Sequence, residues 1–303
     1  MHCELVVPGL LASGMRLASL ELLAARGRRG EARSRPLESW LQEAFGLDGR
    51  LNAGAISLLG AGGAPGDAPW TRADPVHMEI RRERVLMVPA AALQVSREET
   101  QALCDSLSRH FDGTLQFHPL DARRWCARLA RDMDLGDEPP LGIDGREATI
   151  GPEDALLTEV QMLLHAHPVN AAREARGEPV LNSVWFWGSG RLPGGASCPW
   201  QSVTSDDPFA LGLARLARAG AREATASAES WLSRAPEDGR HLIVLEPRET
   251  IERDWFAPLV AALRSERIGM LSVHVPDAGL SVETIRGDLR RFWRRAKALQ
   301  SYA

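Results

Sequence analysis

The feature that most constrains the fold is the segment Val184–Trp187, in which four consecutive residues are β-branched or aromatic. Such a run, without a polar break, predicts a short buried strand. Gly188, Ser189 and Gly190 follow directly and predict that the strand ends in a turn before Arg191. In open α/β sheets, ligands bind just beyond the carboxyl ends of strands, and glycines let a ligand or another backbone approach closely. The segment is therefore either part of a ligand site or an aromatic core strand followed by an ordinary turn.

Strands alternate with helices at both ends of the chain. Apolar runs predict a first strand at 4–10, cut short by Pro8 and Gly9, and later strands at 241–245 and 270–275. Helical segments are predicted around these strands, at 11–29, 36–45, 207–219, 222–232, 255–264 and 281–299. This alternation predicts an α/β sheet with helices on its faces.

The middle of the chain has a different pattern. Strands are predicted at 84–88, 113–118 and 124–129, and the Asp-Pro step at 74–75 is expected to be extended. Long helices are predicted at 96–111 and 153–176, the second interrupted by Pro168. A short strand at 55–59 is expected inside a stretch rich in Gly, Ala and Pro, and residues 132–152 are expected to form an acidic loop. The middle of the chain therefore predicts an α+β region.

Charge and cysteine content restrict the classes of function. The net charge is −4, from 36 basic and 40 acidic residues, so no global field attracts nucleic acid. Lys297 is the only lysine, which excludes a Walker-type phosphate-binding lysine and leaves Schiff-base chemistry to that residue alone. The four cysteines lack metal-ligand spacing and are expected to be reduced, mostly buried thiols. Since there is no apolar run of about 18 residues, we expect a soluble, cytoplasmic protein without a membrane partner.

Residues 70–77, W-T-R-A-D-P-V-H, gather aromatic, charged and titratable groups in a short segment. Asp74 and His77 are compatible with a catalytic pair, although a structural hydrogen bond is the commoner outcome for such a pair. His165 and His167 lie two residues apart on a predicted helix, so they do not share a face and form a poor metal pair. The sequence contains no convincing Ser-His-Asp order and no reactive-cysteine context.

Several motifs resemble a known family. The run H-P-V-N at 167–170, the arginine at 173, and an asparagine, strand and glycine turn at 182–190 occur in the same order in cofactor-independent phosphoglycerate mutases of the archaeal-type branch. The runs at 70–77, 124–125 and 185–190 resemble still more closely the bacterial RpfE-type regulatory proteins. The resemblance covers most of the chain and is most specific at 73–77 and 167–191.

The resemblance implies an alkaline-phosphatase-like α/β fold. A core sheet with helices on both faces would come from residues 1–74 and 181–303, and a smaller α+β domain, 75–180, would be inserted between them. Enzymes of this superfamily use two divalent metals, a serine nucleophile, and carboxylate and histidine ligands. The two cations offset the charge on the attacking and leaving oxygens.

Three places where the resemblance implies catalytic groups lack them in this chain. The first strand ends in Pro8 instead of a metal-binding aspartate. Pro36 or Leu37 stands near the position of the serine nucleophile. The stretch 273–279 lacks the implied Asp-His pair, and His274, which alternates within an apolar strand, is expected to be a core or hydrogen-bonded histidine.

A fourth departure is Trp187, which occupies the position where the mutases carry a phosphate-binding arginine. A neutral indole cannot replace a bidentate phosphate clamp. The predicted ligand-binding residues, without a metal, are Arg72, Asp74, His77, Arg124, His167, Asn170, Arg173, Trp187, Gly188, Gly190 and Arg191. Converging arginines suit a small anionic ligand or an acidic partner surface, and the alternative is that they are solvated or form structural ion pairs.

These departures predict a catalytically degenerate relative of the mutases, a pseudoenzyme without a metal cofactor. Its role would be regulatory, through an unknown protein partner or a small anionic ligand. The alternative is an active phosphoglycerate mutase or phosphatase that uses Mn²⁺ or Zn²⁺ held by displaced ligands such as Asp74, His77, Asp206 and Asp207.

A third hypothesis is association with nucleic acid. The predicted terminal helix carries six basic residues between Arg286 and Lys297, with Phe292 and Trp293 among them. The alternative for this segment is a solvated helix that packs through its aromatic residues.

Overall fold

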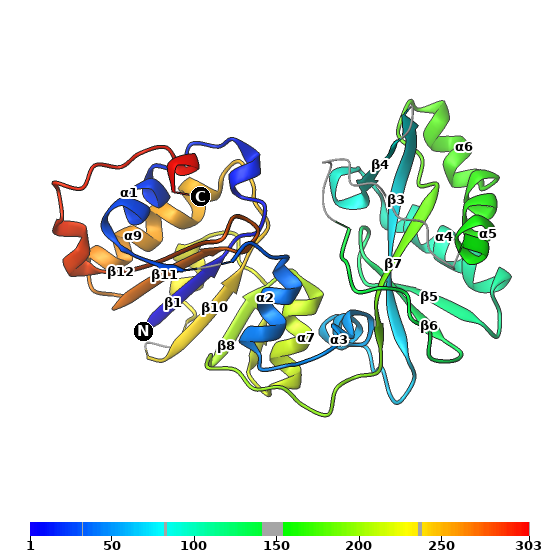
Figure 1. Ribbon diagram of the computed structural model, residues 1–303, viewed down its shortest axis with the longest axis horizontal. Helices are drawn as coiled ribbons and strands as arrows, with labels where there is room; N and C mark the ends of the chain where they lie inside the picture. The colour runs from blue at the N-terminus through cyan, green and yellow to red at the C-terminus, as the bar shows by residue number, and fades with distance from the viewer. Residues whose placement is uncertain (32, 82–83, 141–153, 236–237, 303) are drawn as a thin grey trace. The chain divides into compact units, whose positions relative to one another are not determined.

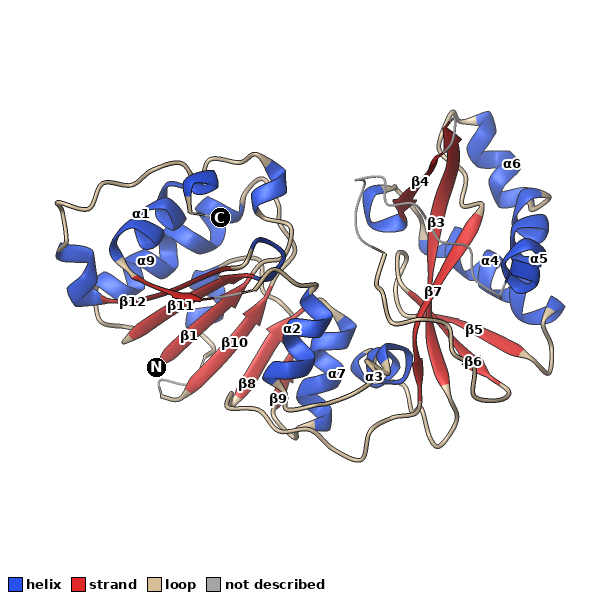
Figure 2. Ribbon diagram, in the orientation of Figure 1, coloured by secondary structure: helices blue, strands red, loops and turns tan. Residues whose placement is uncertain are grey.

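The computed structural model describes residues 1–31, 33–81, 84–140, 154–235 and 238–302 (Figure 1). The chain divides into two compact units. Unit 1 is Met1–Asp48 with Gly195–Ala303, and unit 2 is Gly49–Gly194. Unit 1 holds a mixed sheet with helices on its faces, and unit 2 holds an antiparallel sheet with its own helices (Figure 2). The predicted fold class is confirmed.

The sheet of unit 1 has seven strands in the order β2-β12-β11-β1-β10-β8-β9. The strands from β11 to β9 are parallel, and β12 and β2 extend the sheet in antiparallel fashion. The bounds are β1 (His2–Val6), β2 (Arg28–Glu31), β8 (Ser202–Ser205), β9 (Gly220–Arg222), β10 (Arg240–Val244), β11 (Met270–Val275) and β12 (Leu280–Ile285). The helices are α1 (Ala18–Arg26), α2 (Leu37–Ala44), α7 (Pro208–Leu216), α8 (Ala228–Leu232) and α9 (Ala257–Arg264).

Alternation along the central strands of unit 1 divides apolar from polar side chains. Cys3 and Leu5 of β1 join the core formed with α1, α8 and α9, while Glu4 points to the opposite face. On that opposite face the ring of Trp40, from α2, lies 5.2 Å from the ring of His274. None of the described helices has the length and apolar character needed to cross a membrane.

Unit 2 is built on β3, which pairs with β4, β6 and β7, while β5 pairs with β6. The bounds are β3 (Trp70–Arg81), β4 (Arg84–Pro89), β5 (Leu115–Pro119), β6 (Trp125–Leu129) and β7 (Ser183–Gly190). The helices are α3 (Ala53–Gly60), α4 (Arg97–His110), α5 (Asp154–His165) and α6 (Pro168–Ala175). Residues of α4, α5 and the strands form one apolar core. The two domain boundaries predicted from the resemblance, after residue 74 and after residue 180, both lie within unit 2. Strand β3 continues across the first of them.

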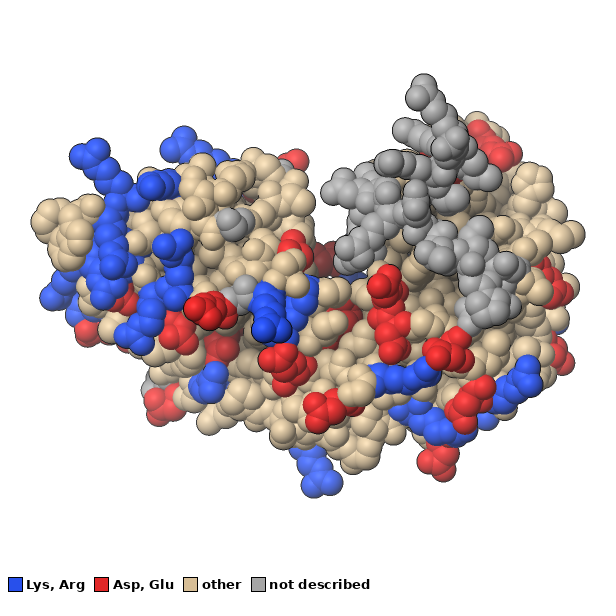
Figure 3. Space-filling model, viewed as in Figure 1, with Lys and Arg blue, Asp and Glu red and all other residues tan. Residues whose placement is uncertain are grey.

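Two predicted elements are wrong in type. Residues 55–59 belong to helix α3 and not to a strand. Gly54 lets this helix pack directly against β3, since a Cβ at that position would lie 2.5 Å from the backbone of Thr71. Residues 281–299 are not a helix. They contain the end of β12, the 3₁₀ turn η5 (Arg286–Arg290) and an irregular segment before η6 (Leu299–Ser301). Figure 3 shows Lys and Arg side chains gathered on the side of unit 1 where this segment lies.

Other predicted helices are present but shorter. The helix expected at 153–176 is interrupted at Pro168, as predicted, and forms α5 and α6, with His167 as the N-cap of α6. Residue 153 lies outside the described residues, as do 141–152 of the expected acidic loop. The segment 222–232 is helical only in α8.

The strand predicted at 184–187 runs on to Gly190 and lies in the antiparallel sheet of unit 2. It therefore does not end at the carboxyl edge of the parallel sheet, and the expected turn after residue 187 is absent. Gly188 has φ +60°, and a Cβ there would lie 2.4 Å from the Cβ of Ala53. The glycines of this segment let the start of helix α3 pack closely against β7. The sequence allowed for a close approach of another backbone at these positions, and α3 is that backbone.

Candidate functional site

The carboxyl ends of β1 and β11 bring together, in unit 1, the segments to which the sequence resemblance assigns catalysis. Pro8 follows β1, and the N–H of Gly9 donates a 2.8 Å hydrogen bond to Oδ1 of Asp277. The hydroxyl of Ser34 donates to the backbone carbonyl of Asp277 at 2.6 Å. Pro36 is the N-cap of α2 and supplies no hydroxyl. These segments therefore lie together at the end of β1, and Pro8 and Pro36 supply neither a carboxylate nor a hydroxyl there.

These residues do not fit a two-metal centre. Among the described residues, no three His, Cys, Asp or Glu side chains are grouped so as to hold a metal ion. Pro8 offers no side-chain ligand, and two of the three carboxylates proposed as displaced ligands, Asp206 and Asp207, have structural roles in unit 1. Asp207 caps α7 through a 3.0 Å bond from the N–H of Ala210, and Asp206 accepts the N–H of Ala224 at 3.1 Å.

A cluster of titratable groups lies on the polar face of the same sheet. Glu4 is 5% exposed, and its carboxylate accepts hydrogen bonds from Arg240 at 2.7 and 3.0 Å. His2 lies 3.6 Å and His274 3.8 Å from that carboxylate. His274 is also 3.1 Å from the hydroxyl of Ser281, as expected for a hydrogen-bonded histidine. In the sequence H-C-E-L-V of β1, polar and apolar residues alternate, which places His2 and Glu4 on one face of the strand. The cluster was not predicted from this alternation.

This cluster makes folding stability depend on pH. Burial by itself would raise the pKa of Glu4, but contacts with His274 and Arg240 outweigh it and lower the pKa from 4.5 to about 2. A lowered carboxyl pKa stabilises the fold above the unfolded value and loses that contribution as the pH falls. Burial also lowers the pKa of His2, so its charging in acid opposes folding as the pH falls below 6.5.

Glu4→Gln should therefore destabilise unit 1 at neutral pH by roughly 2–3 kcal/mol and flatten the loss of stability between pH 4.5 and 2. Urea unfolding at several pH values measures both effects. Glu31→Gln, at an exposed position of β2, is the matched control. An acid profile of Glu4→Gln that runs parallel to that of the wild type would assign the acid sensitivity to other groups.

In unit 2, three of the predicted site residues form one buried network. Arg72 donates to Oδ1 of Asp74 through Nη2 at 2.7 Å and Nε at 3.2 Å. The indole Nε1 of Trp187 donates to Oδ2 of Asp74 at 2.8 Å, and the guanidinium of Arg72 lies 5.1 Å from the Trp187 ring centroid. Nη1 of Arg72 also donates to the hydroxyl of Ser57 at 3.2 Å, and the backbone N–H of Trp125 donates to Oδ1 of Asp74 at 3.2 Å. Each of these three residues is at most 5% exposed, so Trp187 packs in the core and offers no docking surface.

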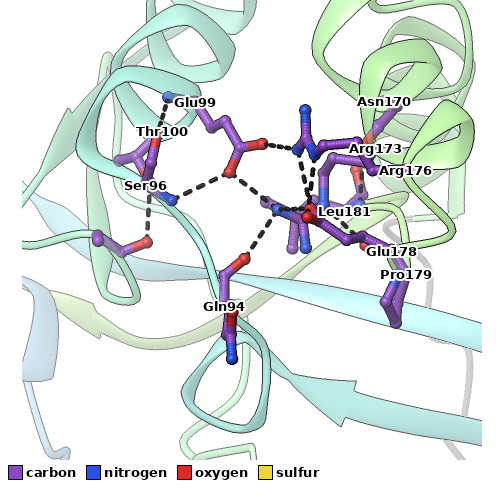
Figure 4. Close-up of polar contacts among 11 residues, drawn as sticks. Gln94, Ser96, Glu99, Thr100, Asn170, Arg173, Arg176, Glu178, Pro179 and Leu181 are labelled. Carbon is purple, nitrogen blue, oxygen red and sulfur yellow. Dashed lines mark hydrogen bonds and ion pairs between the residues drawn. The ribbon is translucent and has the colours of Figure 1, made fainter.

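A second network surrounds Arg173 in α6 (Figure 4). The side chain is 1% exposed and donates to the carbonyls of Pro179 and Gln94 at 2.8 and 2.9 Å and to Glu99 at 2.8 Å. Glu99 also closes the capping box of α4 and pairs with Arg176 at 2.7 Å. Arg173 therefore ties α6 to the start of α4, and its donors are directed at groups of the protein itself.

The neighbours of Arg173 in the predicted site also have partners within unit 2. Asn170 bridges the carbonyls of Leu164 and Leu181 and accepts the N–H of Leu181. His167 caps α6, and its Nε2 lies 2.9 Å from the hydroxyl of Ser106. Burial lowers the pKa of His167, which favours the neutral form that a cap requires.

The remaining predicted residues lie outside these two networks. Nδ1 of His77 is 2.9 Å from the carbonyl of Val180, so His77 and Asp74 have different partners and form no catalytic pair. Arg124 pairs with Asp121 at 2.8 Å. Arg191 pairs with Asp132 at 3.0 Å and lines an open groove of about 910 Å³ at one end of the unit 2 sheet. Arg191 is the one predicted residue among the described groups that line this groove.

The groove was not predicted from the sequence. Besides Arg191 it is lined by Arg109 and Arg128, and by the carboxylates of Asp67 and Asp112. These residues come from α4 and the turn after it, from β6, and from the segments that precede β3 and follow β7, so no short motif brings them together. The arrangement can hold an anionic group through guanidinium side chains.

Comparison with protein-family models finds no match to this sequence, and comparison with curated proteins finds none either. Among solved structures, the PH0037 protein from Pyrococcus horikoshii matches with a TM-score of 0.52 and 13% identity, over 93% of this chain and 86% of that chain. The cofactor-independent phosphoglycerate mutase from Thermoplasma acidophilum DSM 1728 matches with a TM-score of 0.48 and 16% identity, over 100% of this chain and 94% of that chain. At such identities the likeness concerns the fold alone.

Proposed function

We propose that this chain is a catalytically degenerate phosphoglycerate-mutase-like protein, related to the RpfE-type regulatory proteins, and acts as a regulatory, ligand-binding or protein-interaction factor. The observation that carries the proposal is the end of β1. Pro8 stands there, and the backbone N–H of Gly9 holds the carboxylate of Asp277. Phosphoryl transfer in this superfamily needs metal-bound oxygens at that edge, and these groups cannot provide them.

A binding role is supported by the groove in unit 2. Arg128 projects from β6 and is exposed, and it has no hydrogen-bond or ion-pair partner for its guanidinium among the described residues. Its neighbours Arg109 and Arg191 are bonded within the protein, which fixes their positions. A free guanidinium beside two fixed ones suits a small anionic ligand or an acidic side chain of a partner.

A cytoplasmic setting is supported by the thiols. All four cysteines are free, and three are buried. Burial raises the pKa of Cys126 to about 12 and also raises the pKa of Cys3 and Cys104. Such thiols are poor nucleophiles and are typical of core packing in a reducing compartment.

Metal content and turnover test the proposal. Protein purified with Mn²⁺ or Zn²⁺ present should retain no stoichiometric metal, and it should not interconvert 3- and 2-phosphoglycerate above the rate of a buffer blank. An active mutase assayed in parallel is the positive control. Stoichiometric metal, together with turnover that a chelator abolishes, would establish the active-enzyme alternative.

The same preparation can be titrated calorimetrically with 3-phosphoglycerate. Binding without turnover, weakened about tenfold in Arg128→Gln by loss of one charge-assisted contact, would support the ligand-binding role. Arg97→Gln is the matched control, since Arg97 is exposed in the same unit and does not line the groove. Equal binding by both variants would place the ligand elsewhere.

A further inference from the structure

The segment after β12 exposes two adjacent aromatic side chains. Phe292 is 78% exposed and Trp293 is 67% exposed. Their ring centroids are 5.3 Å apart, with the ring planes at 81°. Large aromatic side chains usually bury most of their surface, so a neighbouring pair left in solvent marks a site of interaction.

The segment is anchored on both sides of this pair. Leu289 is buried, and its carbonyl accepts a 2.6 Å hydrogen bond from Arg26. Arg291 donates to the carbonyl of Arg26 at 2.9 Å and pairs with Asp288 at 2.8 Å. On the other side, the N–H of Lys297 donates to the hydroxyl of Tyr302. Phe292 and Trp293 are therefore exposed on a segment whose two ends are bonded to the rest of unit 1.

Positive charge surrounds the aromatic pair. Two carboxylates near the segment are paired with arginines, since Glu266 pairs with Arg286 and Asp288 pairs with Arg291. The side chains of four further cations are exposed and have no carboxylate partner in the part of the chain that the structure describes, namely Arg290, Arg294, Arg295 and Lys297. The edge strand β2, which pairs with β12, carries two further exposed arginines, Arg28 and Arg29.

We propose that the segment Arg290–Lys297 binds single-stranded nucleic acid. Its cations would contact phosphates, and Phe292 and Trp293 would stack on successive unpaired bases, which is how sequence-tolerant single-strand binders combine charge with aromatic platforms. Perpendicular rings present their faces in different directions, as a turning strand of unstacked bases requires. This role goes beyond the proposed function and uses none of its residues.

Two other anionic partners fit the segment less well. Recognition of a duplex commonly places a helix in the major groove, and between residues 286 and 298 the structure has only the 3₁₀ turn η5. Surface binding to a membrane commonly uses a helix with one continuous apolar face. Here arginines stand directly on both sides of the aromatic pair, and the two rings do not share a plane.

Fluorescence anisotropy of the full chain with a labelled oligothymidylate of about 20 nucleotides tests the proposal, since such a strand is longer than the site of one small binding surface. Binding should weaken steeply with salt, with a slope of log K against log salt near −3 for four contacted phosphates. Phe292→Ala and Trp293→Ala should each weaken binding by about 5- to 150-fold, the loss expected for one stacked base.

A matched pair of charge variants separates local contacts from net charge. Arg294→Gln with Arg295→Gln should make the salt slope shallower by about 1.4, from two lost phosphate contacts. Arg218→Gln with Arg234→Gln removes the same charge from exposed positions near β9, the opposite edge of the sheet, and should leave the slope unchanged. All four positions are exposed, so thermal unfolding should be the same in both double variants.

Three outcomes would overturn the proposal. The first is absence of oligothymidylate binding at about 50 mM salt, where electrostatic binding is strong. The second is binding that both alanine variants leave unchanged. The third is binding to phosphatidylserine vesicles or to duplex DNA with the single strand unbound, which would assign the surface to one of those partners.

Discussion

Replacing Arg173 by methionine should lower the free energy of unfolding of unit 2 by about 3–5 kcal/mol. Methionine keeps most of the apolar stem, so packing is largely preserved and the loss reports the guanidinium. Its removal leaves the carbonyls of Pro179 and Gln94 without their donor and takes one partner from Glu99, whose side chain is 16% exposed. Loss of three hydrogen bonds from a guanidinium that is itself 1% exposed, together with loss of one partner of a mostly shielded carboxylate, is costly.

Urea unfolding followed by circular dichroism measures this loss. The matched control is Arg176→Gln, because Arg176 bonds the same Glu99 but has 47% of its side chain exposed to water. That variant should unfold close to the wild type, since exposed pairs are screened. Equal effects of the two substitutions would mean that the Arg173 network behaves as a surface ion pair. Arg173 would then be free to act as a ligand residue.

Much of the fold could be predicted because its signals are local. The helix expected at 96–111 is α4, and its start is fixed by the capping box between Ser96 and Glu99. The strands expected at 241–245 and 270–275 are β10 and β11, and the apolar runs that predicted them are buried in the sheet. Where a periodic pattern and an end signal coincide, the sequence and the structure agree.

The wrong predictions share a non-local cause. Helix α3 is permitted by Gly54 and Gly188, whose missing side chains let it pack against β3 and β7. Nothing in residues 55–59 reveals that contact. Residues 281–285 form a strand because β11 and β2 lie on either side of them and satisfy their backbone, although the charge pattern of 281–299 suits a helix. Tertiary pairing overrode local preference in both segments.

The candidate site was harder to predict than the fold. Arg72, Asp74 and Trp187, three of the eleven predicted ligand-binding residues, lie together in the structure. Their partners, however, are each other, and the bond between Asp74 and Trp187 spans 113 positions in the sequence. Spacing along a chain indicates which groups are chemically able to bind a ligand, but it does not indicate whether the fold has already satisfied them.

Asp74→Asn should destabilise unit 2 by about 3–5 kcal/mol while changing almost no volume, because the charge of Arg72 is left buried with no counter-charge. The effect exceeds that of one lost hydrogen bond, since Asp74 also accepts the indole N–H of Trp187 and the backbone N–H of Trp125. An asparagine side chain can accept through one oxygen only, so at least one of these donors loses its partner.

A double-mutant cycle separates the ion pair from the rest of the network. Arg72→Met removes the buried cation, so adding Asp74→Asn to that variant should cost about 2 kcal/mol less than in the wild type. Trp187→Phe is the control for the hydrogen bond and should cost about 1–3 kcal/mol, since it leaves both charges paired. Additive effects of Arg72→Met and Asp74→Asn would contradict the pairing. The two residues would then act independently, and each would again be available to a ligand.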